Sequence, residues 1–221
     1  MELDHIFVCA SVGAPEAVRL SEFGLIEGSA NIHPGQGTAN RRFFFSNAMI
    51  ELLWVHNQAE AQSPATRPTH LWERWVGRTT GACPFGFCFR PKPSHDGKLP
   101  FPSWEYRPNY LTAPLCMHIG TNSETLSEPM LVYLAFVKSV ERRAAFDREP
   151  REHKAGLGEI TRIEIVTPHA VNASAALNAM VESRQLQLRK GESYALHVGF
   201  DGEKQGKIAD IQPLLPLVFH W

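Results

Sequence analysis

The stretch most suggestive of chemistry is a glycine-containing loop at residues 33–40, which reads HPGQGTAN. Paired glycines before a threonine are typical of loops that hold a phosphate. Such loops need a strand before them and a helix after them, whose N–H groups meet the anion. Here residues 41–45, RRFFF, follow and favour a strand. The sequence therefore predicts a loop that shapes another kind of pocket, with Gly35 or Gly37 at a positive φ.

Two further polar residues, His5 and Glu51, lie among apolar neighbours in predicted strands. A carboxylate buried in an apolar strand needs a cation, a metal ion or several hydrogen-bond donors. For Glu51 a salt bridge with Arg41 or Arg42 of the preceding strand would be sufficient. A single histidine on a strand is often a hydrogen-bonded structural residue. Residue types alone leave the structural and the functional interpretations of both side chains open.

Composition and charge narrow the class of protein. The chain has 221 residues, of which 43% are hydrophobic and 20% charged, and its formal net charge is −1. These values are ordinary for a globular protein and favour neither nucleic acid nor a membrane as a partner. No apolar run approaches ~18 residues, and the N-terminus lacks a signal-peptide pattern. A cytoplasmic location is therefore expected.

The cysteines are expected to be structural thiols. The spacings of Cys9, Cys83, Cys88 and Cys116 match no zinc finger and no CxxC redox motif. Cysteines of a cytosolic protein are normally reduced, and all but Cys83 have apolar neighbours, as small core residues do.

The elements that must position these residues have the same order at both ends of the chain. Residues 1–56 predict β-α-β-β-β, and residues 158–221 predict that order again with little residue identity. Residues 57–157 form an irregular middle segment with additional strands. These strands are expected at 83–90, 115–120 and 130–136. A single β-α-β-β-β unit leaves a sheet face that a second unit can cover, so one compact α+β domain is expected.

Some boundaries are more specific. The short second strand of the first unit is expected at residues 25–27. In the last unit, Asn172 is expected to cap a helix at 173–182. The proline-rich stretch 91–114 predicts irregular structure, and 142–154 predicts a charged, exposed connection.

Three pieces of the N-terminal unit together resemble a known family. LDHIFV at residues 3–8, HPGQGTANRRFFF at 33–45 and IELLWV at 50–55 are similar to the glyoxalase-like domain of the vicinal oxygen chelate superfamily, which includes glyoxalases, bleomycin-resistance proteins and dioxygenases. The likeness covers about a quarter of the chain. It implies paired β-α-β-β-β modules that form an open, barrel-like mixed sheet, which many members use to hold a divalent metal ion.

The resemblance also implies a ligand set. Metal ligands in the superfamily come from the first and last strands of each module, which here carry His5 and Glu51. An imidazole and a carboxylate suit Zn, Fe, Mn or Ni. The second module departs from the pattern, because Arg162 stands opposite His5 and residues 217–220 contain no carboxylate. The middle segment offers His118 as a third ligand or general base, and Glu128 is a poorer candidate because it precedes a proline.

Four residues near the loop are expected to contact the substrate: His33, Asn40, Arg42 and Trp54. Each also has a simpler explanation: His33 and Asn40 could shape the loop, Arg42 could pair with Glu51, and Trp54 could belong to the core.

Two classes of function follow from the resemblance. One is a metal-dependent lyase, isomerase or dioxygenase, in which the metal ion stabilises an enediolate or activates oxygen. The other is a metal-free protein that binds and sequesters a small molecule, as bleomycin-resistance relatives do; a structural member without a site is a third. A small organic molecule is the expected partner, and a homodimer is left open as the assembly.

Overall fold

The computed structural model describes residues 1–93, 97–137, 146–169 and 172–221, and its secondary structure is α+β with two mixed sheets. The N-terminal elements follow the order β-α-β-β-β. They are β1 (Glu2–Cys9), α1 (Ala17–Phe23), β2 (Asn31–His33), β3 (Thr38–Phe44) and β4 (Met49–Val55). The second strand therefore lies later than expected, and residues 25–27 contribute only an isolated bridge from Glu27 to Phe43.

In its described residues the middle segment contributes four strands and two short α-helices. They are α2 (Gln58–Ala61), α3 (Leu71–Gly77), β5 (Phe85–Arg90), β6 (Ser103–Tyr106), β7 (Met117–Gly120) and β8 (Met130–Tyr133). Strand β6 lies within the proline-rich stretch 91–114, where irregular structure was expected, although residues 94–96 are outside the described part.

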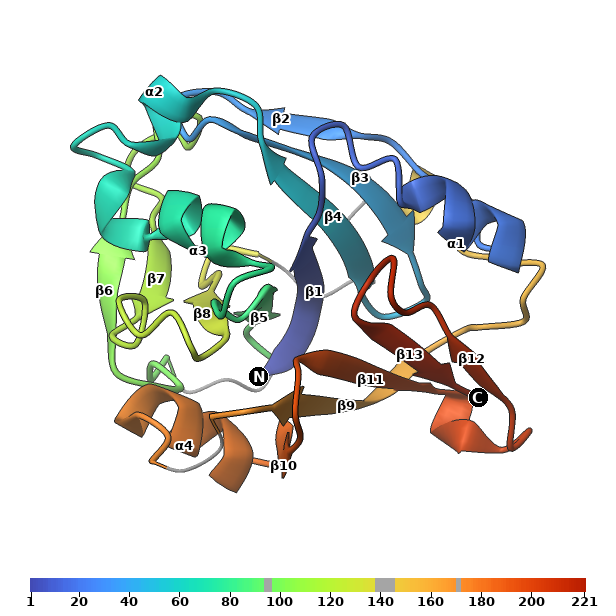
Figure 1. The fold of residues 1–221 in the computed structure, drawn as a ribbon. Helices are drawn as coiled ribbons and strands as arrows, with labels where there is room; N and C mark the ends of the chain where they lie inside the picture. The colour runs from blue at the N-terminus through green and yellow to red at the C-terminus, as the bar shows by residue number, and fades with distance from the viewer. Residues whose placement is uncertain (94–96, 138–145, 170–171) are drawn as a thin grey trace.

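These middle strands complete the first sheet. Its eight strands have the order β2-β3-β4-β1-β5-β8-β7-β6. Strand β1 pairs in parallel with β4 on one side and antiparallel with β5 on the other. Strand β5 in turn pairs in parallel with β8. In Figure 1, β2–β4 and β6–β8 therefore lie on opposite sides of the central pair β1 and β5.

The C-terminal residues form a second sheet of five strands rather than extending the first. Its elements are β9 (Ile160–Thr167), α4 (Ala175–Glu182), β10 (Gln187–Lys190), β11 (Ala195–Phe200), β12 (Ile208–Asp210) and β13 (Leu217–His220). The strand order is β10-β9-β11-β13-β12. Within this region the N-cap of α4 is Ser174, whose hydroxyl accepts from the Leu177 N–H, so the expectation that Asn172 caps the helix is wrong. Of the expected connection at 142–154, residues 142–145 lie outside the described part.

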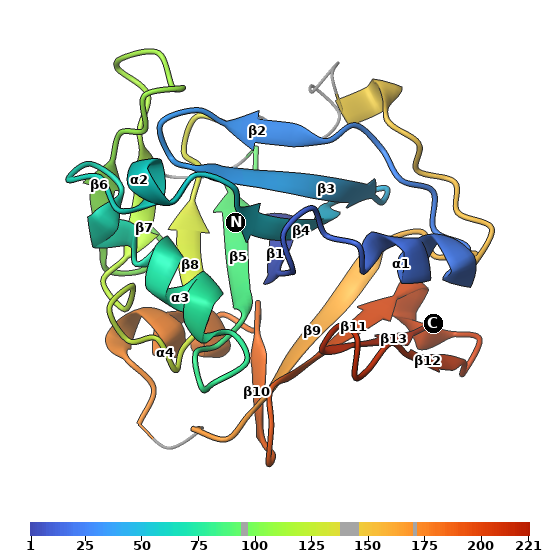
Figure 2. The same cartoon turned by 45° about the horizontal axis from the view of Figure 1, so that its top comes forward.

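The two faces of the eight-stranded sheet have different partners, because side chains alternate along each strand. One face packs on the five-stranded sheet through the main core, in which Ile6, Phe87 and Leu131 meet Ile165 and Phe219. The other face carries a separate apolar cluster that includes Phe7, Cys88 and Val132. Figure 2 shows the five-stranded sheet below β1 and β5, with α2 and α3 beside β6–β8.

A turn between β3 and β4 fastens the two sheets together at one end. The Asn47 side chain donates a hydrogen bond to the Ile160 carbonyl at 2.8 Å and accepts one from the Ile160 N–H at 3.0 Å. No helix in the described residues has the length and apolar character needed to cross a membrane.

Candidate functional site

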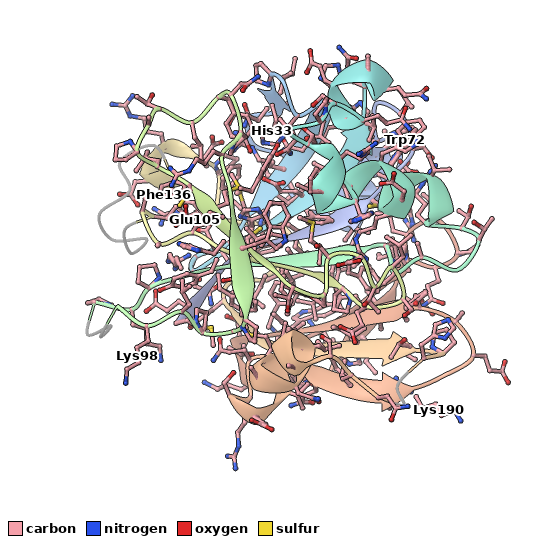
Figure 3. All side chains as sticks on the ribbon, turned by 90° about the vertical axis from the view of Figure 1, so that its left-hand side faces the viewer. His33, Trp72, Lys98, Glu105, Phe136 and Lys190 are labelled. Carbon is pink, nitrogen blue, oxygen red and sulfur yellow. The ribbon has the colours of Figure 1, made fainter. Side chains whose placement is uncertain are left out.

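The second face of the eight-stranded sheet borders a cavity of about 160 Å³. Apolar side chains from β1, β4 and β8 line most of it, among them Phe7, Leu53 and Val132. His5, His33 and Glu51 reach the same cavity, so the structure brings together three of the residues singled out by the sequence. Figure 3 views the molecule from the side of β6–β8, with His33 near α2 and the five-stranded sheet at the bottom.

An irregularity in β1 orients His5. The pairing of β1 with β5 shifts register between Leu3 and His5, so Asp4 is an extra residue on β1 with no partner on β5. In a regular strand the side chains of Asp4 and His5 would point to opposite faces. Here Asp4 Oδ1 lies 2.8 Å from His5 Nδ1. A carboxylate accepts only, so His5 Nδ1 carries the proton, which fixes the ring orientation.

The surroundings of His5 favour its charged form. Burial alone would lower its pKa, but Cys88, Glu51 and Asp4 together raise that pKa well above its ordinary value. Asp4 is itself buried and accepts from Arg90 Nη1 at 3.3 Å. The imidazole therefore lies between two carboxylates that stabilise a positive charge.

Cys88 lies directly across from His5 in the β1–β5 pairing and lines the cavity. Burial raises the pKa of Cys88, and His5 opposes that shift. The resting group is a thiol. Its burial agrees with the prediction of a core cysteine, but its position beside His5 was not anticipated, because the partner strand of β1 is not encoded in the local pattern.

Glu51 is buried, with 5% of its surface exposed, and no hydrogen bond or ion pair of its carboxylate is found within the described residues. The expected partners are engaged elsewhere. Arg41 donates to the Glu27 carboxylate, and Arg42 donates to the backbone and hydroxyl oxygens of Ser29. The salt-bridge explanation for Glu51 is therefore wrong. Arg42 is the pairing partner of Glu51 on β3, but its guanidinium donates to Ser29. His5 lines the same cavity as Glu51, which lies two residues beyond the His5 partner Met49 on β4.

A row of polar side chains joined by hydrogen bonds forms another part of the cavity wall. Thr38 Oγ1 accepts from Gln36 Nε2 at 2.8 Å and lies 3.0 Å from His33 Nδ1. The Tyr110 hydroxyl donates to Gln36 Oε1 at 3.1 Å, and its ring centroid is 5.3 Å from that of His33. Burial lowers the pKa of His33, so this imidazole is neutral. Tyr110 comes from the β6–β7 connection and bridges to the β2–β3 turn.

The glycine loop connects β2 to β3 as a tight turn beside this wall. Gly35 and Gly37 have φ values of +78° and +76°, which confirms the predicted need for glycine. A side chain at Gly37 would also bring a Cβ to 2.3 Å from the Asn57 carbonyl oxygen. The Gly35 N–H donates to the Glu60 carboxylate at 2.7 Å, so the loop is held by protein groups.

The other predicted contacts lie away from the cavity. Asn40 is fully buried and accepts from the Asn31 N–H at 2.9 Å, which ties β2 to β3. Trp54 packs against the core between the sheets, on the face opposite Leu53. His118 alternates with Met117 and Ile119, which line the cavity, and its ring approaches Tyr133 on the other face. Neither Trp54 nor His118 is positioned to touch a ligand there.

Glu128, the weaker candidate ligand, is also engaged elsewhere. Its carboxylate accepts from the Ser174 N–H and hydroxyl and from Asn122 Nδ2. A metal ion in the cavity would therefore rely on His5 and Glu51. The described residues contain no group of three or more His, Cys, Asp or Glu side chains arranged to hold an ion. Catalytic zinc sites commonly use three protein ligands, so the donor set is incomplete.

A larger, open groove of about 860 Å³ lies between the two sheets. Its charged side chains are largely satisfied by protein partners. Arg90 pairs with Glu2 and Asp4, and Arg162 pairs with Glu164 and Glu203. The smaller cavity, with its unpaired carboxylate, is the better candidate site.

Comparison with known proteins shows the fold and leaves the chemistry open. No family model and no curated protein sequence matches the chain. A solved structure of a hypothetical protein from Staphylococcus aureus is similar over 99% of this chain and 98% of that chain, with a TM-score of 0.54 and 11% sequence identity. At that identity the likeness concerns the arrangement of the backbone alone.

Proposed function

We propose that the chain is a glyoxalase-like protein of the vicinal oxygen chelate type that binds and transforms a small organic molecule in the cavity beside β1. The strand arrangement supports this assignment. Two halves, β1 to β4 and β5 to β8, each place their first and last strands side by side in parallel, and the two first strands pair in the middle of the sheet. In this proposal the middle segment supplies the second half of the cup, in place of residues 158–221.

The functional proposal rests on Glu51, whose carboxylate is buried and accepts no hydrogen bond from the described residues. A buried carboxylate without hydrogen-bond donors is costly, and proteins retain such groups mainly where a ligand uses them. Glu51 reaches a small, mostly apolar cavity together with His5, which Asp4 orients. The site thus combines an acceptor and a donor in a mostly apolar cavity.

The pair can perform proton transfer on a carbonyl compound. Glu51 takes a proton from the carbon next to the carbonyl, while the His5 imidazolium gives a proton to the carbonyl oxygen, which forms an enol. In an α-hydroxycarbonyl compound this enol is an enediol. Glu51 then returns its proton to the former carbonyl carbon while the other hydroxyl gives its proton to His5, so the carbonyl moves to the neighbouring carbon and both side chains regain their starting states. General acid–base catalysis of this kind contributes typically about 10² to 10⁴ in rate. These residues support isomerase or lyase chemistry without a metal ion.

A divalent ion bound by His5 and Glu51 would add Lewis-acid polarisation of the carbonyl oxygen. The Asp4–His5 hydrogen bond resembles the outer-shell contact that orients metal-binding histidines. Because the protein donor set is incomplete, the metal-dependent version of the proposal, dioxygenase chemistry included, needs ligands from water or substrate.

The second candidate is a metal-free protein that sequesters its ligand, and the mostly apolar cavity wall favours it. An exchange experiment separates the two. Protein purified without chelators or a metal column is first analysed for bound transition metals. It is then incubated in D₂O with small ketones and hydroxyketones, and deuterium entry beside the carbonyl is followed by NMR.

We expect exchange with the unaltered protein and its loss in Glu51→Gln. Glu105→Gln is the matched control, since Glu105 is exposed on β6 and paired with Arg107. Saturable binding without exchange supports sequestration. If neither exchange nor binding occurs with any compound, the cavity has no such function and the proposal fails.

A further inference from the structure

A cleft of about 430 Å³ lies apart from the cavity beside β1, and the two have no described lining residue in common. It forms where connections of both sheets meet. They are residues 11–16 between β1 and α1, residues 78–84 between α3 and β5, and residues 213–216 between β12 and β13. Pockets for small organic molecules commonly have about 300 to 1,000 Å³, so the cleft is large enough to hold one.

Glu16 lines this cleft and lacks a full set of partners. The residue is buried, with 7% of its surface exposed. Its Oε1 accepts a hydrogen bond from the Ser11 N–H at 2.9 Å, whereas its Oε2 is shielded from solvent and has no hydrogen-bond partner within the described residues. A buried carboxylate oxygen without a donor is costly, so a ligand that brings a donor to Oε2 is stabilised there.

The other titratable groups of the cleft leave negative charge in excess. Burial raises the pKa of the Cys9 thiol and of the Tyr194 hydroxyl to about 12, so both are uncharged near neutral pH. Glu192 adds a second, exposed carboxylate, and Arg78 adds a guanidinium. Arg78 donates to the Trp75 carbonyl at 2.8 Å and lies 4.9 Å from the centroid of the Trp75 ring, so it is engaged there and not by a carboxylate of the cleft.

We infer that this cleft binds a small organic cation, a primary ammonium group on an apolar body, whose N–H groups donate to Glu16 Oε2. An ammonium–carboxylate hydrogen bond is about twice as strong as one between neutral groups. A ligand carboxylate is instead repelled by Glu16 and Glu192. The apolar body has a matching wall, formed by Pro84, Pro168, Pro213, Leu214, Leu215 and Pro216. This inference does not depend on the function proposed for the cavity beside β1.

Three probes of similar size test the inference: benzylammonium, benzyl alcohol and benzoate. Their dissociation constants are measured by ligand-observed NMR at neutral pH. Benzylammonium is expected to bind at least about tenfold more tightly than benzyl alcohol, and benzoate is expected to bind most weakly.

The position of the probe is read from the backbone amide resonances of isotope-labelled protein. Benzylammonium should shift the amides of Ser11, Gly81 and Ser193, which line the cleft. The amides of Asn31 and His33, which line the cavity beside β1, should stay unchanged.

Glu16→Gln removes the charge but keeps an oxygen that can accept from the Ser11 N–H. In this variant benzylammonium should lose its advantage of about tenfold, whereas benzyl alcohol should bind as before. Glu22→Gln is the matched control, because Glu22 is exposed on α1 and lies 3.7 Å from Arg19. It should leave all three constants unchanged.

A second variant keeps the test independent of the folding of Glu16→Gln. Thr79 is an exposed lining residue, so Thr79→Lys adds a positive charge to the cleft at a position where the fold tolerates it. This variant should weaken benzylammonium and strengthen benzoate, and Thr79→Ser should change neither.

Four results would each overturn the inference. They are no binding of benzylammonium, equal affinities for benzylammonium and benzyl alcohol, amide shifts confined to the cavity beside β1, and an unchanged preference in a folded Glu16→Gln. If Glu16→Gln does not fold, an unchanged benzylammonium affinity in Thr79→Lys overturns it. None of these results bears on deuterium exchange at Glu51, so the two proposals fail separately.

Discussion

Glu128 holds the N-terminus of α4 through Ser174: its Oε1 accepts from the Ser174 N–H and its Oε2 from the Ser174 hydroxyl, both at 2.6 Å. The contact joins the loop before β8 to helix α4 in the C-terminal region. It also places a negative charge at the positive end of the helix.

Glu128→Ala should therefore lower the free energy of unfolding by about 3 kcal/mol, since hydrogen bonds to a buried charged group are lost. Urea unfolding measures the change. Glu124→Ala, at an exposed position of the same loop, should change stability by less than ~0.5 kcal/mol. Equal effects of the two substitutions would show that the contact with Ser174 contributes nothing.

Gly37→Ala should be more destabilising than Gly13→Ala. Both glycines have nearly the same φ, +76° and +77°, so the backbone penalty of about 1 kcal/mol is shared. A Cβ at Gly13 meets nothing within 4 Å, whereas one at Gly37 meets the Asn57 carbonyl oxygen at 2.3 Å. The difference between the melting temperatures of the two variants measures the cost of the steric clash at Gly37. Similar melting temperatures would contradict that cost.

Glu51→Gln should cost less stability than the ~3 kcal/mol expected for breaking a buried ion pair with arginine. A salt bridge with an arginine would make the substitution costly, but Arg41 and Arg42 have other partners. The attraction to the His5 imidazole is lost, but His5 keeps its hydrogen bond to Asp4, and a buried carboxylate no longer has to be desolvated. Chemical denaturation tests this, and a loss of ~3 kcal/mol or more would indicate a structural partner for Glu51.

Acid should destabilise the protein in part through His153. Its Nδ1 accepts from the Ile26 N–H at 2.9 Å, and its Nε2–H donates to the Phe44 carbonyl at 2.8 Å, an arrangement that requires the neutral ring. Burial lowers its pKa in the folded state. The unfolded chain therefore binds more protons as the pH falls below about 6.5, and the contribution to stability is lost in that direction.

Through this one group, the free energy of unfolding changes by at most about 1.4 kcal/mol per pH unit. Unfolding free energies at pH 7.5 and 5.5 are compared for the unaltered protein and His153→Gln. The variant should be less stable at pH 7.5 and should lose less on acidification. An identical loss in both proteins would remove His153 as a cause.

Access to the cavity should depend on Tyr110, which bridges to Gln36 across the β2–β3 turn. In a Cys116→Ser background, alkylation of Cys88 by iodoacetamide reports on entry to the cavity. Tyr110→Ala should raise that rate several-fold. Cys9 has the same exposed fraction, 5%, but does not line the cavity, so its rate should stay constant. A parallel rise at both cysteines would indicate general loosening instead.

Local sequence was sufficient for the features that depend on neighbours along the chain. The β-α-β-β-β order of residues 1–56 follows from alternating apolar residues and turn residues, although the second strand lies at Asn31–His33 and not at 25–27. The positive φ of Gly35 and Gly37 follows from the composition of the loop. That His5 and Glu51 lie on neighbouring strands was an expectation from the family resemblance, and β1 and β4 do pair.

Tertiary structure alone decided which strands meet. Period-two alternation specifies which face of a strand is buried, but it carries no information on the partner strand, so the pairing of β1 with β5 could not be read from the pattern. That pairing puts Cys88 opposite His5, and its bulge turns Asp4 toward the imidazole. A different pairing, of β7 with β8, turns His118 away from the cavity, because its register sets which side chains of β7 face inward.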